Sequence, residues 1–137
     1  NGRITVRDTD GIGGIATSGA QGRSFSLGIA DSVTVLARDA ATADVAATLV
    51  ANAVDIDDPQ VHRSPACALD PDSDLGDALV TTAVGALTQA QIAAALDAGR
   101  ARAEQFRRRG LIRDAALVLQ GETRVLGQTP SLREMKP

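Results

Sequence analysis

Two polar residues spaced four apart are the first candidates for chemistry in this 137-residue sequence. Asp44 and Thr48 lie inside an alanine-rich segment, and on a helix their side chains would point the same way. A carboxylate and a hydroxyl are hard oxygen ligands that suit Mg²⁺. The pair could contribute to a magnesium site, which carbonyls, water or a substrate phosphate would have to complete, although the spacing alone favours a structural role. The alternative is an exposed Asp beside a Thr that packs on a sheet.

A second polar group surrounds two glycine turns near the start of the sequence. Its hydroxyls, backbone amides and single guanidinium could together hold an anion such as a phosphate. A polar hairpin turn without a ligand is the alternative interpretation. The residues of this group are Thr17, Ser18, Gly19, Gly22, Arg23 and Ser24.

Three other patterns favour structural interpretations. Residues 11–16 satisfy the G-x-G-x-x-A dinucleotide fingerprint, but turn-like residues follow where the fingerprint needs a helix. The acidic stretch 70–77 departs from a calcium loop, because Leu75 follows Asp74 and no Glu stands at the required distance. His62 and Cys67, each the only one of its type, are more typical of a surface histidine and a small buried cysteine than of a catalytic dyad.

The composition indicates a small protein with an aliphatic core. Hydrophobic residues make up 44 % of the sequence, yet Phe25 and Phe106 are its only aromatic residues. A stacking platform for a flat cofactor therefore cannot come from this chain alone. The net charge of −3 argues against a nucleic-acid binder. With one cysteine, no signal peptide and no apolar run near the roughly 20 residues of a membrane span, we expect a cytoplasmic protein.

Glycine punctuation and apolar periodicity predict strands in the first part of the chain and two long helices after it. Asp39 is expected to cap the first helix, with Val45, Leu49 and the neighbouring alanines as its apolar stripe. A capping box of Thr88 and Gln91 should begin the second helix, and Gly110 should end it. The expected strands are 3–6, 14–17, 24–27, 32–37 and 79–84, with a hairpin of 115–119 and 123–126. The expected helices are 40–53 and 89–109, residues 54–78 a loop with short ordered pieces, and 128–137 a polar tail after a domain of residues 1–127.

The order of three short motifs resembles the C-terminal region of ApbE-type flavin transferases. The motifs are GIATSG at 14–19, SVTVLA at 32–37 and ADVAAT at 43–48. An uncharacterised branch of the same superfamily is similar also at 22–31 (GRSFSLGIAD) and 69–77 (LDPDSDLGD). The resemblance covers roughly residues 12 to 126.

The resemblance implies an α/β (α+β) fold with an antiparallel-rich sheet and two main helices packed on it. It implies Mg²⁺ on Asp44 and Thr48 with main-chain carbonyls, and Thr17 and Ser18 beside a flavin nucleotide. It also implies that an N-terminal half, on this chain or on a partner chain, completes the fold. A strand that begins near residue 3 agrees with a chain cut from a longer one. The His-x-x-Asp-Pro-like segment of the transferases has no match here, and Asp31 alone could stand for its acidic member.

Three functional hypotheses follow. The first is an ApbE-like protein that binds a phosphorylated or anionic small ligand, with Mg²⁺ and a flavin nucleotide as candidate cofactors. The second is a hydrolase of an amide or ester bond, in which Ser18 and Asp31 are the catalytic candidates. The third is a non-catalytic subunit, in a homo- or hetero-oligomer, that completes the fold of a partner chain. Retained flavin absorbance, turnover of small amides or esters, and co-purification with a second chain would distinguish them.

Overall fold

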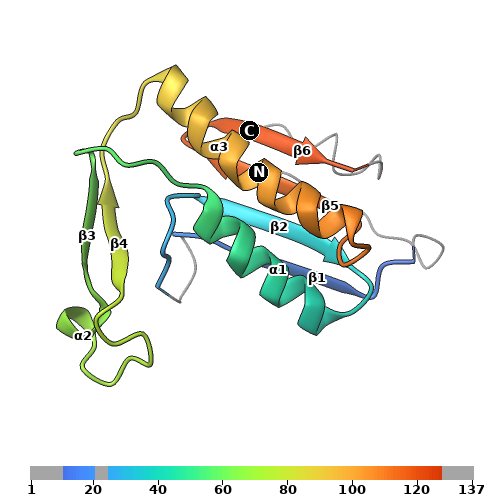
Figure 1. The fold of residues 1–137 in the computed structure, drawn as a ribbon, viewed down its shortest axis with the longest axis horizontal. Helices are drawn as coiled ribbons and strands as arrows, with labels where there is room; N and C mark the ends of the chain where they lie inside the picture. Colours follow the sequence, from blue (N-terminus) through green and yellow to red (C-terminus); the bar gives the residue numbers. More distant parts are fainter. Residues whose placement is uncertain (1–10, 21–24, 128–137) are drawn as a thin grey trace.

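A four-stranded antiparallel sheet forms the main body of the molecule. The computed structural model describes residues 11–20 and 25–127. The strands lie in the order β1-β2-β5-β6 (Figure 1). Their bounds are Gly14–Ser18 for β1, Ser32–Ala37 for β2, Asp114–Leu119 for β5 and Glu122–Leu126 for β6. This architecture confirms the predicted mixed class with an antiparallel sheet.

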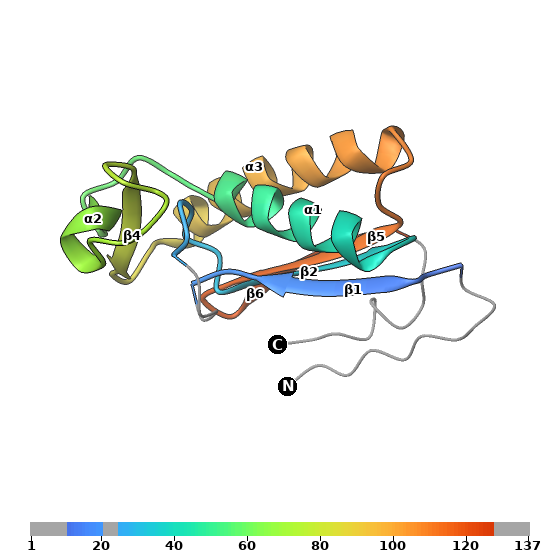
Figure 2. The same ribbon diagram turned by 90° about the horizontal axis from the view of Figure 1, so that it is seen from below.

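Two long helices cover one face of this sheet (Figure 2). Helix α1 (Ala40–Ala53) lies over β1 and β2, and helix α3 (Gln89–Arg108) lies over β5 and β6. Both helices begin at the predicted caps. The Asp39 carboxylate accepts a hydrogen bond from the Thr42 amide at 2.8 Å, and Thr88 with Gln91 forms the complete capping box.

A projecting arm leaves one end of the body (Figure 1). It consists of the antiparallel strands β3 (Val61–Pro65) and β4 (Leu79–Val84), joined through the one-turn helix α2 (Ala66–Leu69). The sequence predicted β4 but assigned the partner strand to a loop. The segment 61–65 contains His, Arg, Ser and Pro, and it becomes a strand because β4 pairs with it.

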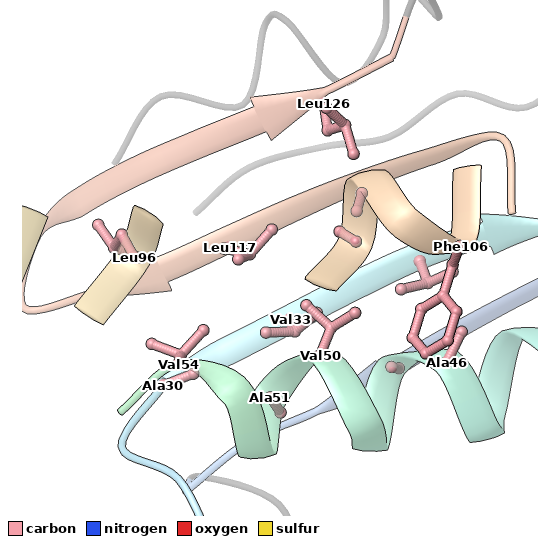
Figure 3. Close-up of a cluster of buried hydrophobic side chains, with 14 of the residues drawn as sticks. Ala30, Val33, Ala46, Val50, Ala51, Val54, Leu96, Phe106, Leu117 and Leu126 are labelled. Carbon is pink, nitrogen blue, oxygen red and sulfur yellow. The ribbon is translucent and has the colours of Figure 1, made fainter. Parts of the chain in front are cut away.

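Small side chains set the spacing of the core between helices and sheet. Strand β2 contributes Val33 and Val35, β5 contributes Leu117, and α3 contributes Leu96, all of them buried. Figure 3 shows Val33, Leu96 and Leu117 within this layer. Helix α1 meets this layer mainly with alanine, which allows its backbone to approach the sheet closely. The buried residues of α1 are Ala43, Ala46, Ala47, Val50 and Ala51.

The predicted apolar stripe of α1 was wrong in part. Val45 is 58 % exposed and Leu49 is 38 % exposed, so both lie on the outer side of the helix. The sequence contains enough alanine for either of two stripes, and the close helix–sheet spacing selects the one with the smaller side chains.

The expected strand 24–27 is also wrong where it can be checked. Residues 25–27 form no strand, and the Leu27 amide instead donates to the Asn52 side chain at 3.2 Å. The expected strand 3–6 and the tail 128–137 lie outside the described residues. No helix in the described part of the chain is long and apolar enough to cross a membrane.

Candidate functional site

Asp44 and Thr48 lie one turn apart on α1, and both are exposed. The Thr48 hydroxyl donates to the Asp44 main-chain oxygen at 3.1 Å, which leaves the hydroxyl oxygen free to accept or to ligate. No hydrogen bond from a described residue occupies the Asp44 carboxylate. The two side chains thus present oxygen atoms on one flank of the helix, away from its buried alanine stripe.

Thr17 and Ser18 point to opposite faces of the sheet, because side chains alternate along a strand. Ser18 is opposite Val33, a core residue, so its side chain is on the face that the helices cover. Thr17 is opposite Thr34 on the other face, and the two hydroxyl oxygens are 3.0 Å apart. One ligand could therefore reach both hydroxyls only around the end of β1.

Gly19 occupies that strand end. Its φ is +138°, and a Cβ there would lie 2.6 Å from the Asp31 main-chain oxygen. The Ala20 amide continues the contact by donating to the Ala30 oxygen at 2.8 Å. Glycine is required here because the two chain segments approach so closely.

Asp31 lies beside this strand end and has a structural partner. Its Oδ2 accepts a hydrogen bond from the Gln120 amide at 2.8 Å, in the β5–β6 turn. Gln120 has a φ of +45°, and its side chain bonds the Leu87 amide at 3.0 Å and the Gly85 oxygen at 2.8 Å. The Asp31 carboxylate therefore helps to hold the β5–β6 turn, and the Gln120 side chain in that turn contacts the segment before α3.

The predicted metal ligands on α1 and the predicted anion-binding residues on β1 lie at a similar height along the two elements. A Cβ at Gly14 would overlap the backbone of Asp39 and Ala40, so both elements start from one point. From there they run in the same direction (Figures 1 and 2). Four strand residues advance about 13 Å and eight helical residues about 12 Å. Ser18 and Thr48 are thus at a similar height along adjacent elements.

Three side chains that the sequence did not single out fix the segment 26–29. Asn52 accepts from the Leu27 amide, Arg63 donates to the Leu27 oxygen at 2.7 Å, and Thr81 donates to the Gly28 oxygen at 2.6 Å. Arg63 also forms an ion pair with Asp55. These partners are 25 to 53 residues away in sequence, so no local pattern could have indicated them. The remaining predicted residues, Gly22, Arg23 and Ser24, lie outside the described residues.

Cys67 and His62 do not form a nucleophilic pair. The Cys67 thiol donates to the Asp77 carboxylate at 3.4 Å, and this hydrogen bond raises the pKa of the thiol above its ordinary value. A thiol kept protonated is a poor nucleophile. Across residues 11–20 and 25–127, no three His, Cys, Asp or Glu side chains are grouped as they would be to hold a metal ion. Any cation at Asp44 and Thr48 would thus need ligands of other kinds.

The fold and these contacts define a mixed α+β domain with polar groups at the β1–α1 side of its sheet. The chain belongs to the family described as "AbpE bacteria", whose match covers residues 1–125. It is also similar to a UPF0280 protein of Methanopyrus kandleri, with 43 % identity over 83 residues, or 58 % of this chain. That match spans 34 % of the relative, so the chain corresponds to about a third of its length. No solved structure matches this chain.

Proposed function

We propose that this chain forms part of an ApbE-like protein that binds a phosphorylated or anionic small ligand together with Mg²⁺. Membership of the "AbpE bacteria" family and the ordered GIATSG, SVTVLA and ADVAAT motifs support the relation to ApbE-type proteins. A flavin nucleotide is the first ligand to test. The proposal assigns the metal to Asp44 and Thr48, and the ligand contacts to Thr17, Ser18, Gly19, Arg23 and Ser24.

One observation carries this proposal. Asp44 and Thr48 present a carboxylate and a hydroxyl on the same exposed flank of α1, at the height where β1 ends. Mg²⁺ prefers octahedral oxygen ligands and usually keeps several waters, with one or two protein ligands plus substrate phosphates. Two protein oxygens next to a glycine-containing strand end therefore suit a magnesium–phosphate complex better than a metal held by protein alone.

Each group would have a defined task in such a complex. The Asp44 carboxylate would supply the negative charge that attracts the cation, and the Thr48 oxygen would fix its position one helical turn away. Ser18, on the helix-covered face, would donate a hydrogen bond to the anionic ligand. The bound Mg²⁺ would neutralise phosphate charge and polarise a phosphoryl oxygen.

The hydrolase hypothesis needs Ser18 to be activated by a neighbouring base. Asp31 is at the same end of the sheet, but its Oδ2 accepts a hydrogen bond from the Gln120 amide. No hydrogen bond joins the Ser18 hydroxyl to Asp31 or His62 in the described structure. Hydrolysis would therefore require a further group to activate Ser18, whereas the proposed anion binding requires no activated nucleophile.

Calorimetric titration of the chain with MgCl₂, and then with FMN or FAD in the presence of Mg²⁺, tests the proposal. We expect Asp44→Ala to weaken Mg²⁺ binding and Mg²⁺-dependent flavin binding by at least about tenfold, because the charged ligand is lost. Asp57→Ala, which removes another exposed carboxylate, is the matched control and should bind as the native chain does. Equal Mg²⁺ affinity in the native and Asp44→Ala chains would rule out the metal assignment.

A further inference from the structure

Two exposed surfaces at opposite ends of the molecule have opposite charge and similar apolar character. We define the groove as the hollow between α1 and the end of α3, lined by Val45, Leu49, Phe106 and Leu111. We define the arm tip as residues 66–79, the connection between β3 and β4 together with the first residue of β4. Figure 1 shows the arm at one end and the last turns of α3 toward the other.

The groove is apolar, and an arginine of α3 and the arginine that caps this helix lie at its edge. It has a volume of about 340 Å³, and Val45, Leu49 and Leu111 are 58 %, 38 % and 41 % exposed. The Arg102 guanidinium stacks over the Phe106 ring, 4.7 Å from its centroid. Arg109 follows Phe106 by three residues, is exposed, and so lies on the same side of α3. Arg100, Arg107 and Arg108 line a separate hollow beside β6. An apolar hollow with Arg102 and Arg109 at its edge favours an occupant that is both apolar and acidic.

The arm tip has that composition. Leu69, Leu75 and Leu79 are 51 %, 40 % and 55 % exposed. Residues 66–79 also contain four aspartates and no basic residue. Hydrogen bonds within the tip hold its turns, among them the Cys67 amide to the Gly76 oxygen at 2.8 Å. The tip therefore offers its leucines and carboxylates in a fixed arrangement, which lowers the entropic cost of docking.

We infer that the arm tip of one copy of this chain docks in the groove of a second copy. Exposed leucines would be buried against Val45, Leu49 and Leu111, while aspartates would meet Arg102 and Arg109. Within one chain the two surfaces are too far apart to meet, since they lie toward opposite ends of the molecule (Figure 1). A reciprocal pair, in which each arm enters the other groove, closes the assembly with two-fold symmetry.

Sedimentation velocity of the full chain tests this pairing over a range of micromolar concentrations. We expect a species of twice the 14.0 kDa chain mass. The single charge reversals Asp74→Arg and Arg109→Glu should each raise the dimer dissociation constant about tenfold or more, because each puts like charges together. The double variant Asp74→Arg/Arg109→Glu should recover most of the affinity. Asp57→Arg, an exposed reversal outside both surfaces, is the control.

Several results would overturn the inference. A native chain that stays monomeric leaves the groove for a different partner or for another part of a longer protein. Single variants that pair as tightly as the native chain would place a dimer contact elsewhere. A double variant no tighter than the singles would show that the two charges do not meet. Asp44 and Thr48 belong to neither surface, so these outcomes are independent of the magnesium proposal.

Discussion

Gly99 sets the distance between α3 and its neighbours, although it contributes no side chain. A Cβ added there would overlap the Val54 side chain at the end of α1 and lie 2.9 Å from Leu117 Cδ2 of β5. Glycine inside a helix normally costs about 1 kcal/mol relative to alanine. The close contact of three elements at this position explains why the smaller residue is accommodated.

Gly99→Ala should therefore destabilise the protein despite the better helix propensity of alanine. We expect a loss of about 1–3 kcal/mol in the free energy of unfolding, because the added methyl overpacks the core. Urea denaturation measures this loss. In the background of Val54→Ala, which removes the nearest atoms, the penalty of Gly99→Ala should shrink. An equal penalty in both backgrounds would contradict the packing explanation.

The placement of some candidate site residues could be predicted from the sequence, whereas the placement of others could not. Spacing placed Asp44 and Thr48 on one flank of a helix, and the structure has them there because helix geometry is local. Strand geometry is equally local, and its alternation puts the side chains of Thr17 and Ser18 on opposite faces of the sheet. The bond between Asp31 and Gln120 spans 89 residues, and only the folded chain brings them together.

At the level of elements, α1 depends on a charged cap. Both Asp39 oxygens accept hydrogen bonds from Thr42, one from its amide at 2.8 Å and one from its hydroxyl at 3.1 Å. These bonds lower the pKa of the Asp39 carboxyl below its ordinary value of 3.8. They satisfy an amide in the first turn that has no partner within the helix.

The stabilising effect of this cap should depend on pH. Because the folded pKa lies below the unfolded one, the contribution is complete above the unfolded value and is lost as pH falls through the folded value. Asp39→Asn keeps a capping oxygen but does not titrate. We expect the gap in thermal midpoint between the native chain and Asp39→Asn to narrow between about pH 5 and pH 3. Circular dichroism melts measure it, and a constant gap would contradict the titration.

At the scale of the whole molecule, Arg63 couples the arm to the body. From β3 it donates to the Leu27 oxygen and pairs with Asp55, in the segment that follows α1. A two-stranded ribbon is only marginally stable by itself. The arm therefore keeps its position through a few polar contacts with the body, of which those of Arg63 and Thr81 are the clearest.

Arg63→Met should weaken this coupling while retaining most of the side-chain length. We expect a loss of about 1–2 kcal/mol in the free energy of unfolding. The loss is modest because the Arg63 and Asp55 side chains are about a quarter and a third exposed, so water screens their ion pair. Hydrogen exchange should become faster at the amides of 27–29 and of β3. Arg100→Met removes an exposed arginine from α3 and is the matched control. Unchanged exchange in Arg63→Met would show that the arm is held by other contacts.

The sequence by itself determined the elements whose signals are local. Both long helices and their caps, strand β2 and the β5–β6 hairpin follow from apolar periodicity, capping residues and turn glycines. Tertiary structure decided the rest. It selected the alanine stripe of α1 over Val45 and Leu49, made 61–65 a strand by pairing it with β4, and turned 25–28 into an anchored loop. These outcomes depend on partners distant in the chain, whose contacts carry no periodic signal in the sequence.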